Sequence, residues 1–176
     1  MSASPSLIIL GGLPGVGKTA IARELARQTG AVHVRIDSIE QALRDSGAIT
    51  GAMDDHGYRV AYAAAEDELR LGRDVIADCV NPLQLTRTAW REVAKHCGAI
   101  SIEVEITCSD QTEHRRRVER RDNDIPALKL PTWDGVLGRK YEQWDREHLT
   151  VDSAASSIEE IVAQIRRALI DSGYRK

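Results

Sequence analysis

Residues 12–19, GLPGVGKT, match the phosphate-binding pattern G-x-x-x-x-G-K-[ST] at each fixed position. Glycines in this pattern let the backbone curl so that successive N–H groups point at phosphate oxygens, and a helix beginning near Lys18 adds the positive end of its dipole. In such loops the lysine reaches the β- and γ-phosphates, and the hydroxyl of the next residue, here Thr19, completes a Mg²⁺ shell. We expect the nucleotide to contact Gly12, Pro14, Gly15, Val16, Gly17, Lys18, Thr19 and Ala20.

Two other classes of P-loop protein need motifs that the sequence lacks. A GTPase would carry a guanine-reading N-K-x-D, which does not occur, and the D-x-x-G match that begins at Asp54 does not follow an apolar strand. An ATPase motor would end an apolar strand with Asp-Glu, whereas Asp78 is followed by Cys79. A small kinase remains, with ATP and Mg²⁺ as the expected cofactors and a substrate hydroxyl as the acceptor.

Two carboxylates follow apolar segments. Asp37 comes directly after residues 32–36, and Asp78 ends the segment that begins at Val75. Ligands bind at the carboxyl ends of parallel strands, so the side chain of Asp37 is expected to face the γ-phosphate. Asp37 could accept the proton of the attacking hydroxyl or could cap the next helix. Asp78 could hold the waters of the Mg²⁺ ion beside Thr19, bind substrate, or cap a turn.

A cluster of arginines, HRRRVERR at residues 114–121, precedes the proline-containing segment 122–131. Arg117 and Arg121 are four positions apart and would share one face of a helix. Planar, permanently charged donors suit the charge that develops on a transferred phosphoryl group. We therefore expect these two to meet the nucleotide, with Arg116 and Arg120 as the alternative pair and a salt-bridged surface helix as the other interpretation. Arg35 and Arg44 could meet the acceptor, but they are interpreted as solvent-exposed surface residues.

Strand-like and helix-like segments alternate along the chain, which predicts a parallel α/β sheet covered on both faces. The first strand, without alternation, is expected at the centre, and the second, with alternating His33 and Arg35, at an edge. The expected strands are residues 7–10, 32–36, 75–77, 100–106 and 149–151, and the expected helices are 18–29, 58–71, 83–96, 110–121, 133–146 and 158–172. Helix 133–146 would carry Trp133, Tyr141 and Trp144 on one face, either as core or as a stacking surface.

Composition favours one domain of cytoplasmic type. The chain has 176 residues, a net charge of −3 and no apolar run long enough to span a membrane. Its three cysteines lack C-x-x-C spacing and are interpreted as buried, reduced thiols. The charge argues against a strongly basic nucleic-acid-binding protein, although a local basic groove stays possible. The sequence makes no prediction of oligomeric state.

Five blocks resemble a known group of P-loop kinases, the one that contains polynucleotide 5′-hydroxyl kinases, zeta toxins and chloramphenicol phosphotransferases. The blocks are GLPGVGKT, VRIDSIEQALR, DVIADCVNP, HRRRVERR and LPTWDGVLGRKYEQWD, and they match most closely the bacterial predicted-kinase branch with AAA-type ATP binding. The resemblance covers nearly the whole chain. It implies a five-stranded parallel sheet in the order 2-3-1-4-5 and a lid, about residues 115–131, that closes over ATP.

The resemblance also implies roles for individual residues. In the polynucleotide kinases an aspartate at the place of Asp37 is the base, and the lid helix supplies one arginine near adenine and one to the phosphates, here Arg117 and Arg121. Asp152 follows the last strand, where adenine usually meets the backbone in this fold.

The expected function is transfer of the ATP γ-phosphoryl group to a hydroxyl of a small molecule, with Lys18, Asp37, Arg117 and Arg121 as catalytic residues and Thr19 and Asp78 at the metal. The acceptor pocket is expected within residues 39–58. A nucleic-acid 5′-hydroxyl kinase is an alternative that the acidic net charge does not favour, and an ATP-dependent switch without transfer is another.

Overall fold

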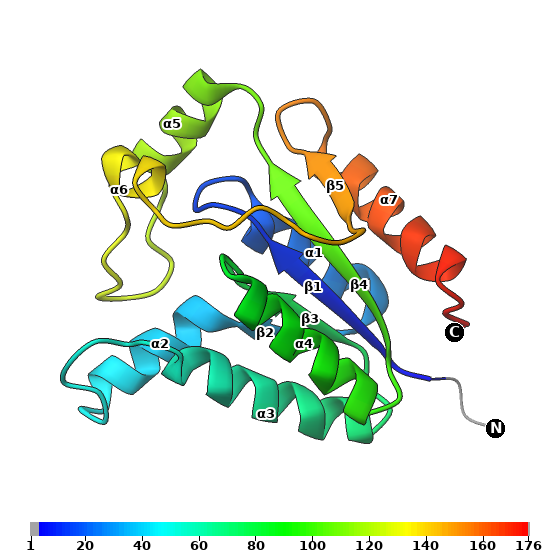
Figure 1. Ribbon diagram of the computed structural model, residues 1–176. Helices are drawn as coiled ribbons and strands as arrows, with labels where there is room; N and C mark the ends of the chain where they lie inside the picture. The colour runs from blue at the N-terminus through cyan, green and yellow to red at the C-terminus, as the bar shows by residue number, and fades with distance from the viewer. Residues whose placement is uncertain (1–3, 176) are drawn as a thin grey trace.

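The computed structural model describes residues 4–175. Its centre is a five-stranded sheet in which every neighbouring pair is parallel, in the order β2-β3-β1-β4-β5 (Figure 1). The strands are β1 (Ser6–Gly11), β2 (Val32–Arg35), β3 (Val75–Asp78), β4 (Ile100–Thr107) and β5 (Leu149–Asp152). The expected strand order is therefore confirmed, with β1 at the centre and β2 at an edge.

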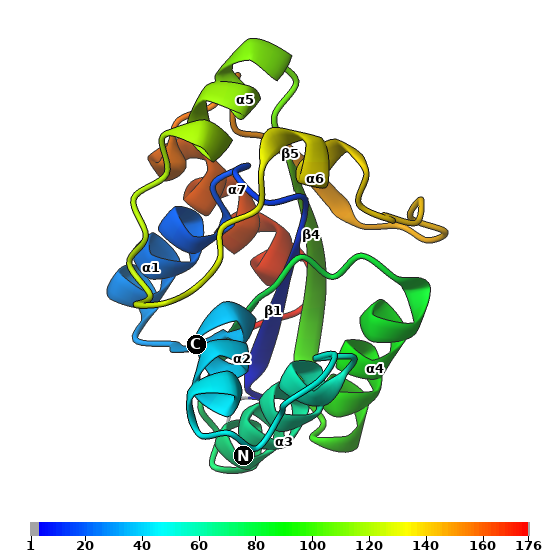
Figure 2. The same ribbon diagram turned by 90° about the vertical axis from the view of Figure 1, so that its left-hand side faces the viewer.

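Helices cover both faces of this sheet. Figure 2 shows α1 (Lys18–Thr29) and α7 (Ile158–Asp171) on one side, with α2 (Ile36–Asp45), α3 (His56–Arg70) and α4 (Gln84–His96) on the other. The remaining helices, α5 (Gln111–Glu119) and α6 (Trp133–Leu137), lie beyond the carboxyl ends of the strands (Figure 1). Among the described residues no helix is long and apolar enough to cross a membrane.

Strand β1 separates two apolar cores. Leu7 and Ile9 belong to the core under α3 and α4, while Ile8 and Leu10 belong to the core under α1 and α7. These four side chains are at most 2% exposed, as a central parallel strand requires. The strand is thereby fixed from both sides, and the phosphate-binding loop that follows it starts from a rigid support.

The expected helix 133–146 is wrong beyond Leu137, because α6 ends there with Gly138 as its C-cap. The cause is Arg87 on α4, which is fully buried and donates hydrogen bonds to the backbone oxygens of Glu142 (2.8 Å) and Gln143 (3.2 Å). A helix would use those carbonyl groups internally, whereas the irregular segment 138–148 turns them toward the guanidinium.

The three aromatic residues of that segment do not share a face. Trp133 packs edge-on against His114, while Trp144 stacks on His148 with ring centroids 4.3 Å apart. The Arg87 guanidinium lies over Tyr141 as well as Trp144. Core packing is the interpretation that these contacts support.

Helix ends follow local sequence signals unevenly. Gly30 ends α1 in the left-handed conformation, and Ser157 with Glu160 forms a complete capping box on α7. Asp110 and Glu113 have the spacing of a capping box at the start of α5, but only one of its two hydrogen bonds forms. The Asp110 side chain accepts from the Glu113 amide, whereas the Glu113 side chain binds arginines instead of the Asp110 amide. Of the three free cysteines, only Cys79 is buried; Cys97 and Cys108 are half-buried, contrary to expectation.

Candidate active site

The phosphate-binding loop joins β1 to α1 and depends on its glycines. Gly12, Gly15 and Gly17 have φ of +136°, +87° and +100°, a region that residues with a Cβ rarely enter. A Cβ on Gly12 would lie 2.2 Å from the backbone oxygen of Ile106, and one on Gly15 would lie 2.5 Å from Cγ2 of Val118. Only glycine therefore lets the loop curl this closely against β4 and α5.

Lys18 begins α1 and is held inside the loop. Its Nζ donates a hydrogen bond to the backbone oxygen of Leu13 at 2.9 Å, and the residue is 8% exposed. Burial lowers the pKa of Lys18, while the negative charges of Asp78 and Asp37 oppose that shift. The positive charge of the Lys18 ammonium group is thus partly balanced by Asp78 and Asp37, the two carboxylates expected from the sequence at the phosphate and metal sites.

Asp78, at the end of β3, is 4% exposed and has several partners. His33 Nε2 lies 3.1 Å from its Oδ2, and the Nε atom of Arg35 lies 4.0 Å from the same oxygen. Burial acts to raise the pKa of Asp78, but the hydrogen bond with His33, the charge of Lys18 and the hydroxyl of Thr19 together lower it. The pKa of this carboxylate is therefore lowered despite its burial, with the hydroxyl of Thr19 among the causes.

Asp37 lies in the first turn of α2, whose N-cap is Arg35, so the helix-cap interpretation of Asp37 is wrong. An arginine from beyond α5 approaches it: Nη2 of Arg121 is 3.7 Å from Oδ2 of Asp37. The Asp37 side chain is 40% exposed, so it is accessible to a ligand.

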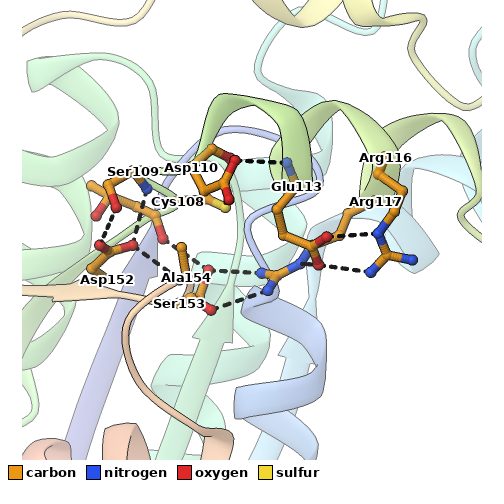
Figure 3. A network of polar contacts seen from close by, with 10 residues as sticks. Cys108, Ser109, Asp110, Glu113, Arg116, Arg117, Asp152, Ser153 and Ala154 are labelled. Carbon is orange, nitrogen blue, oxygen red and sulfur yellow. Dashed lines mark hydrogen bonds and ion pairs between the residues drawn. The ribbon is translucent and has the colours of Figure 1, made fainter.

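Arg117 points in a different direction from Arg121. Helix α5 ends at Glu119, so Arg121 lies outside it and the two do not share a helical face. Arg117 donates to Glu113 (2.7 Å) and to the side-chain and backbone oxygens of Ser153 (2.9 and 3.1 Å), as Figure 3 shows. Arg116 binds the same Glu113 carboxylate, and the two arginines lower the pKa of Glu113 to about 2.

Asp152 ends β5 beside this network but bonds to other groups. Its carboxylate accepts from the amides of Ser109 and Ala154, both at 3.0 Å, and from the Ser109 hydroxyl (Figure 3). These hydrogen bonds lower the pKa of Asp152, those from Ser109 most. The carboxylate ties the turn after β4 to the turn after β5, and Arg117 is anchored to the second of these turns at Ser153.

These groups surround a cavity of about 1260 Å³ at the carboxyl end of the sheet. Single-ligand pockets measure about 300–1,000 Å³, so this one has room for two ligands. Its walls include most of the expected site residues, namely Pro14, Gly15, Gly17, Lys18, Thr19, Ala20, Asp37, Asp78, Arg116, Arg117, Arg120 and Arg121. Gly12, Val16 and Asp152 do not line it; the first two are buried in the loop.

Other residues of the cavity wall were missed or misinterpreted from the sequence. Arg35 was expected to be exposed, yet it is 8% exposed and binds Asp124 in the loop formed by residues 120–132, called here the α5–α6 loop. The available signal was the alternation of His33 and Arg35, which places both on one face of β2. Arg44 is exposed, as expected.

Comparison with known proteins identifies the family and the fold. Residues 7–139 match the family model described as "AAA domain". An uncharacterized protein of Mycobacterium tuberculosis is 43% identical over 164 residues, which are 86% of this chain and 32% of that protein. The chain thus spans about a third of the length of this relative.

Solved kinase structures share the fold. An APS kinase of Mycobacterium tuberculosis, in complex with AMPPNP and APS, gives a TM-score of 0.72 at 17% identity, covering 96% of this chain and 99% of that one. A gluconokinase of Sinorhizobium meliloti gives 0.64 at 21% identity, covering 96% and 94%. The sheet order and the helices around it are those of P-loop kinases, and the chain belongs to the AAA-domain family that residues 7–139 match.

Proposed function

We propose that this chain is a kinase that transfers the γ-phosphoryl group of ATP to a hydroxyl of a small molecule. The observation that carries the proposal is the meeting of Lys18, Asp37 and Arg121 in one cavity over the phosphate-binding loop. A phosphate-binding loop alone would suit any nucleotide-binding protein. A carboxylate that faces the same cavity, with an arginine beside it, adds what transfer to a hydroxyl needs.

Each group then has a defined part. The loop amides and Lys18 hold the β- and γ-phosphates, and Asp37 accepts the proton of the acceptor hydroxyl. Arg121 stabilises the charge on the transferred group, while Arg117 forms the adenine side of the cavity and is held from outside the cavity wall by the turn at Asp152 and Ser153. Residues 115–131 form the lid.

Thr19 and Asp78 fit a Mg²⁺ ion. The Thr19 hydroxyl and the Asp78 carboxylate, whose pKa is lowered, both line the cavity and are oxygen ligands of the kind that this ion takes when phosphates complete its shell. Bound there, Mg²⁺ would neutralise charge on the phosphate oxygens. Among residues 4–175 no group of three or more His, Cys, Asp or Glu side chains could hold a metal, so the ion would depend on the nucleotide.

The acceptor side of the cavity supports a small molecule. Within residues 39–58 the wall consists of Glu40, Gln41, Arg44, Met53, Asp54, Asp55 and Tyr58. Within this stretch three carboxylates accompany one guanidinium, so this part of the wall favours a small acceptor over an oligonucleotide. Burial and the charge of Asp37 raise the pKa of Glu40, whereas Arg44 and Arg139 act against the shift. The free cysteines favour a cytoplasmic location.

The test is transfer of labelled γ-phosphate from ATP and Mg²⁺ to two acceptors in parallel, a deproteinised metabolite extract and a 5′-hydroxyl oligonucleotide. We expect a labelled small molecule with the wild-type chain and none with Asp37→Asn. Asp67→Asn, the same change at an exposed position of α3, is the matched control and should transfer normally. Label on the oligonucleotide would establish the nucleic-acid alternative, and binding of ATP with label on neither acceptor would contradict the kinase proposal.

A further inference from the structure

Asp124 in the α5–α6 loop is held by two arginines from the body of the fold. Arg35 donates to it through the two terminal nitrogens of its guanidinium, Nη1 to Oδ2 at 2.7 Å and Nη2 to Oδ1 at 3.1 Å. Arg23 of α1 forms an ion pair with the same carboxylate. A two-pronged contact of this kind fixes direction as well as distance. In Figure 2 the loop runs down from α5 beside α1, which is where these contacts anchor it.

The guanidinium of Arg35 also lies near a second carboxylate, on the side of its Nε atom. Its Nε atom lies 4.0 Å from Oδ2 of Asp78, which is its register partner on β3. That Nε atom is buried and makes no hydrogen bond among the described residues. A single buried guanidinium therefore lies between the carboxylate beside Thr19 and the carboxylate of the loop.

The anchored loop also carries Arg121, which lies three residues before Asp124 and approaches Asp37. Because Arg35 and Arg23 hold Asp124, the backbone at Arg121, three residues earlier, has little conformational freedom. Arg121 meets Asp37 at 3.7 Å in the same cavity wall that Arg35 lines. The position of Asp124 therefore bears directly on the position of the arginine that faces the proposed base.

We propose that Arg35 is a positioning residue: through Asp124 it anchors the lid over the phosphate-binding loop and so keeps Arg121 beside Asp37. The consequence for transfer rests on the proposed function. The anchoring itself does not, because it concerns only contacts within the chain.

The test compares Asp124→Asn with Asp122→Asn by hydrogen exchange of the amides of residues 121–131, measured without added nucleotide. Both substitutions remove one charge from the same loop, but among residues 4–175 Asp122 makes no side-chain hydrogen bond or ion pair. We expect exchange in this loop to rise about tenfold in Asp124→Asn, because a charge-assisted contact is lost. The amides of β1 and β4 should not change, and Asp122→Asn should behave as wild type.

Equal exchange in Asp124→Asn and wild type would overturn the anchoring. Affinity for AMPPNP, measured by calorimetry, tests the positioning: it should fall about tenfold in Asp124→Asn. If exchange rises but this affinity does not change, the contacts of Asp124 with Arg35 and Arg23 only secure a loop, and the positioning role of Arg35 is wrong. A wild-type chain that binds no AMPPNP would contradict the proposed function, while the exchange comparison would still decide the anchoring.

Discussion

The guanidinium of Arg87 lies 4.1 Å from the centroid of the Trp144 ring, and the arginine side chain is fully buried. Its hydrogen bonds go to backbone oxygens, among them that of Asn81 at 3.0 Å, with no ion pair to a carboxylate among residues 4–175. Arg87 thus joins the turn after β3, which borders the cavity, to the segment that follows α6.

Arg87→Met should destabilise the protein by about 2–4 kcal/mol, since several buried carbonyl groups would lose a charged donor. Urea unfolding followed by circular dichroism measures the change. Arg91→Met, one turn along α4 at an exposed position, is the matched control and should stay within about 0.5 kcal/mol of wild type. A loss of less than about 1 kcal/mol in Arg87→Met would show that segment 138–148 is held by other contacts.

Gly15 connects the phosphate-binding loop to α5 by close contact. In Gly15→Ala the new Cβ would lie 2.5 Å from Cγ2 of Val118, in a backbone conformation of φ +87°. We expect affinity for AMPPNP to fall at least about tenfold, because the loop must shift away from its phosphate-binding shape. Gly98→Ala, with φ +61° and open space around it, should lose stability but keep its nucleotide affinity.

A second substitution separates the collision from the backbone strain in Gly15→Ala. The double variant with Val118→Ala removes the atom that the new Cβ meets, so it should recover part of the affinity if the collision dominates. No recovery would attribute the loss to the positive φ and to the remaining contact with Cδ2 of His114, which lies 3.3 Å from the new Cβ.

The parts of the site that could be predicted from the sequence depend on local patterns. The phosphate-binding loop is contiguous, and β1 is a short apolar run with a helix directly after it, so both follow from neighbouring residues. Asp37 and Asp78 were expected at strand ends, which is correct in outline because parallel strands end at one edge of the sheet.

What could not be predicted depends on contacts between distant residues. Arg35 and Asp124 are 89 positions apart in the sequence, and no pattern among the neighbours of either residue predicts that they form an ion pair. Segment 138–148 has the hydrophobic spacing of a helix. It is nevertheless irregular, because Arg87 binds the backbone oxygen of Glu142, which is 55 positions away in the sequence. In both cases a tertiary contact of a buried arginine outweighs local propensity.

Asp78 should make stability depend on pH. Its pKa lies below the ordinary value of 3.8 in the folded chain, so the folded state binds this proton less readily than the unfolded state. The stabilisation is complete above the unfolded pKa and is lost as the pH falls through the folded pKa. Unfolding free energies of wild type and Asp78→Asn should therefore differ by a constant amount above about pH 5 and converge below it.

The control for this pH series is Asp67→Asn, which removes a carboxylate exposed on α3. Its curve should run parallel to that of wild type. A gap between wild type and Asp78→Asn that stays constant down to about pH 3 would contradict the lowered pKa of Asp78.

Arg117 tests the adenine side of the proposed site. Arg117→Met removes the hydrogen bonds to Ser153 and Glu113, and with them a guanidinium of the cavity wall. We expect affinity for AMPPNP to fall by about tenfold or more, because a charge-assisted contact near the nucleotide is lost. Arg115→Met is the matched control: Arg115 lies on the same helix, binds Glu119 at the surface and does not line this cavity. Calorimetric titration should find Arg115→Met within about twofold of wild type, and a comparable loss in both variants would mean that α5 as a whole, rather than Arg117, supports nucleotide binding.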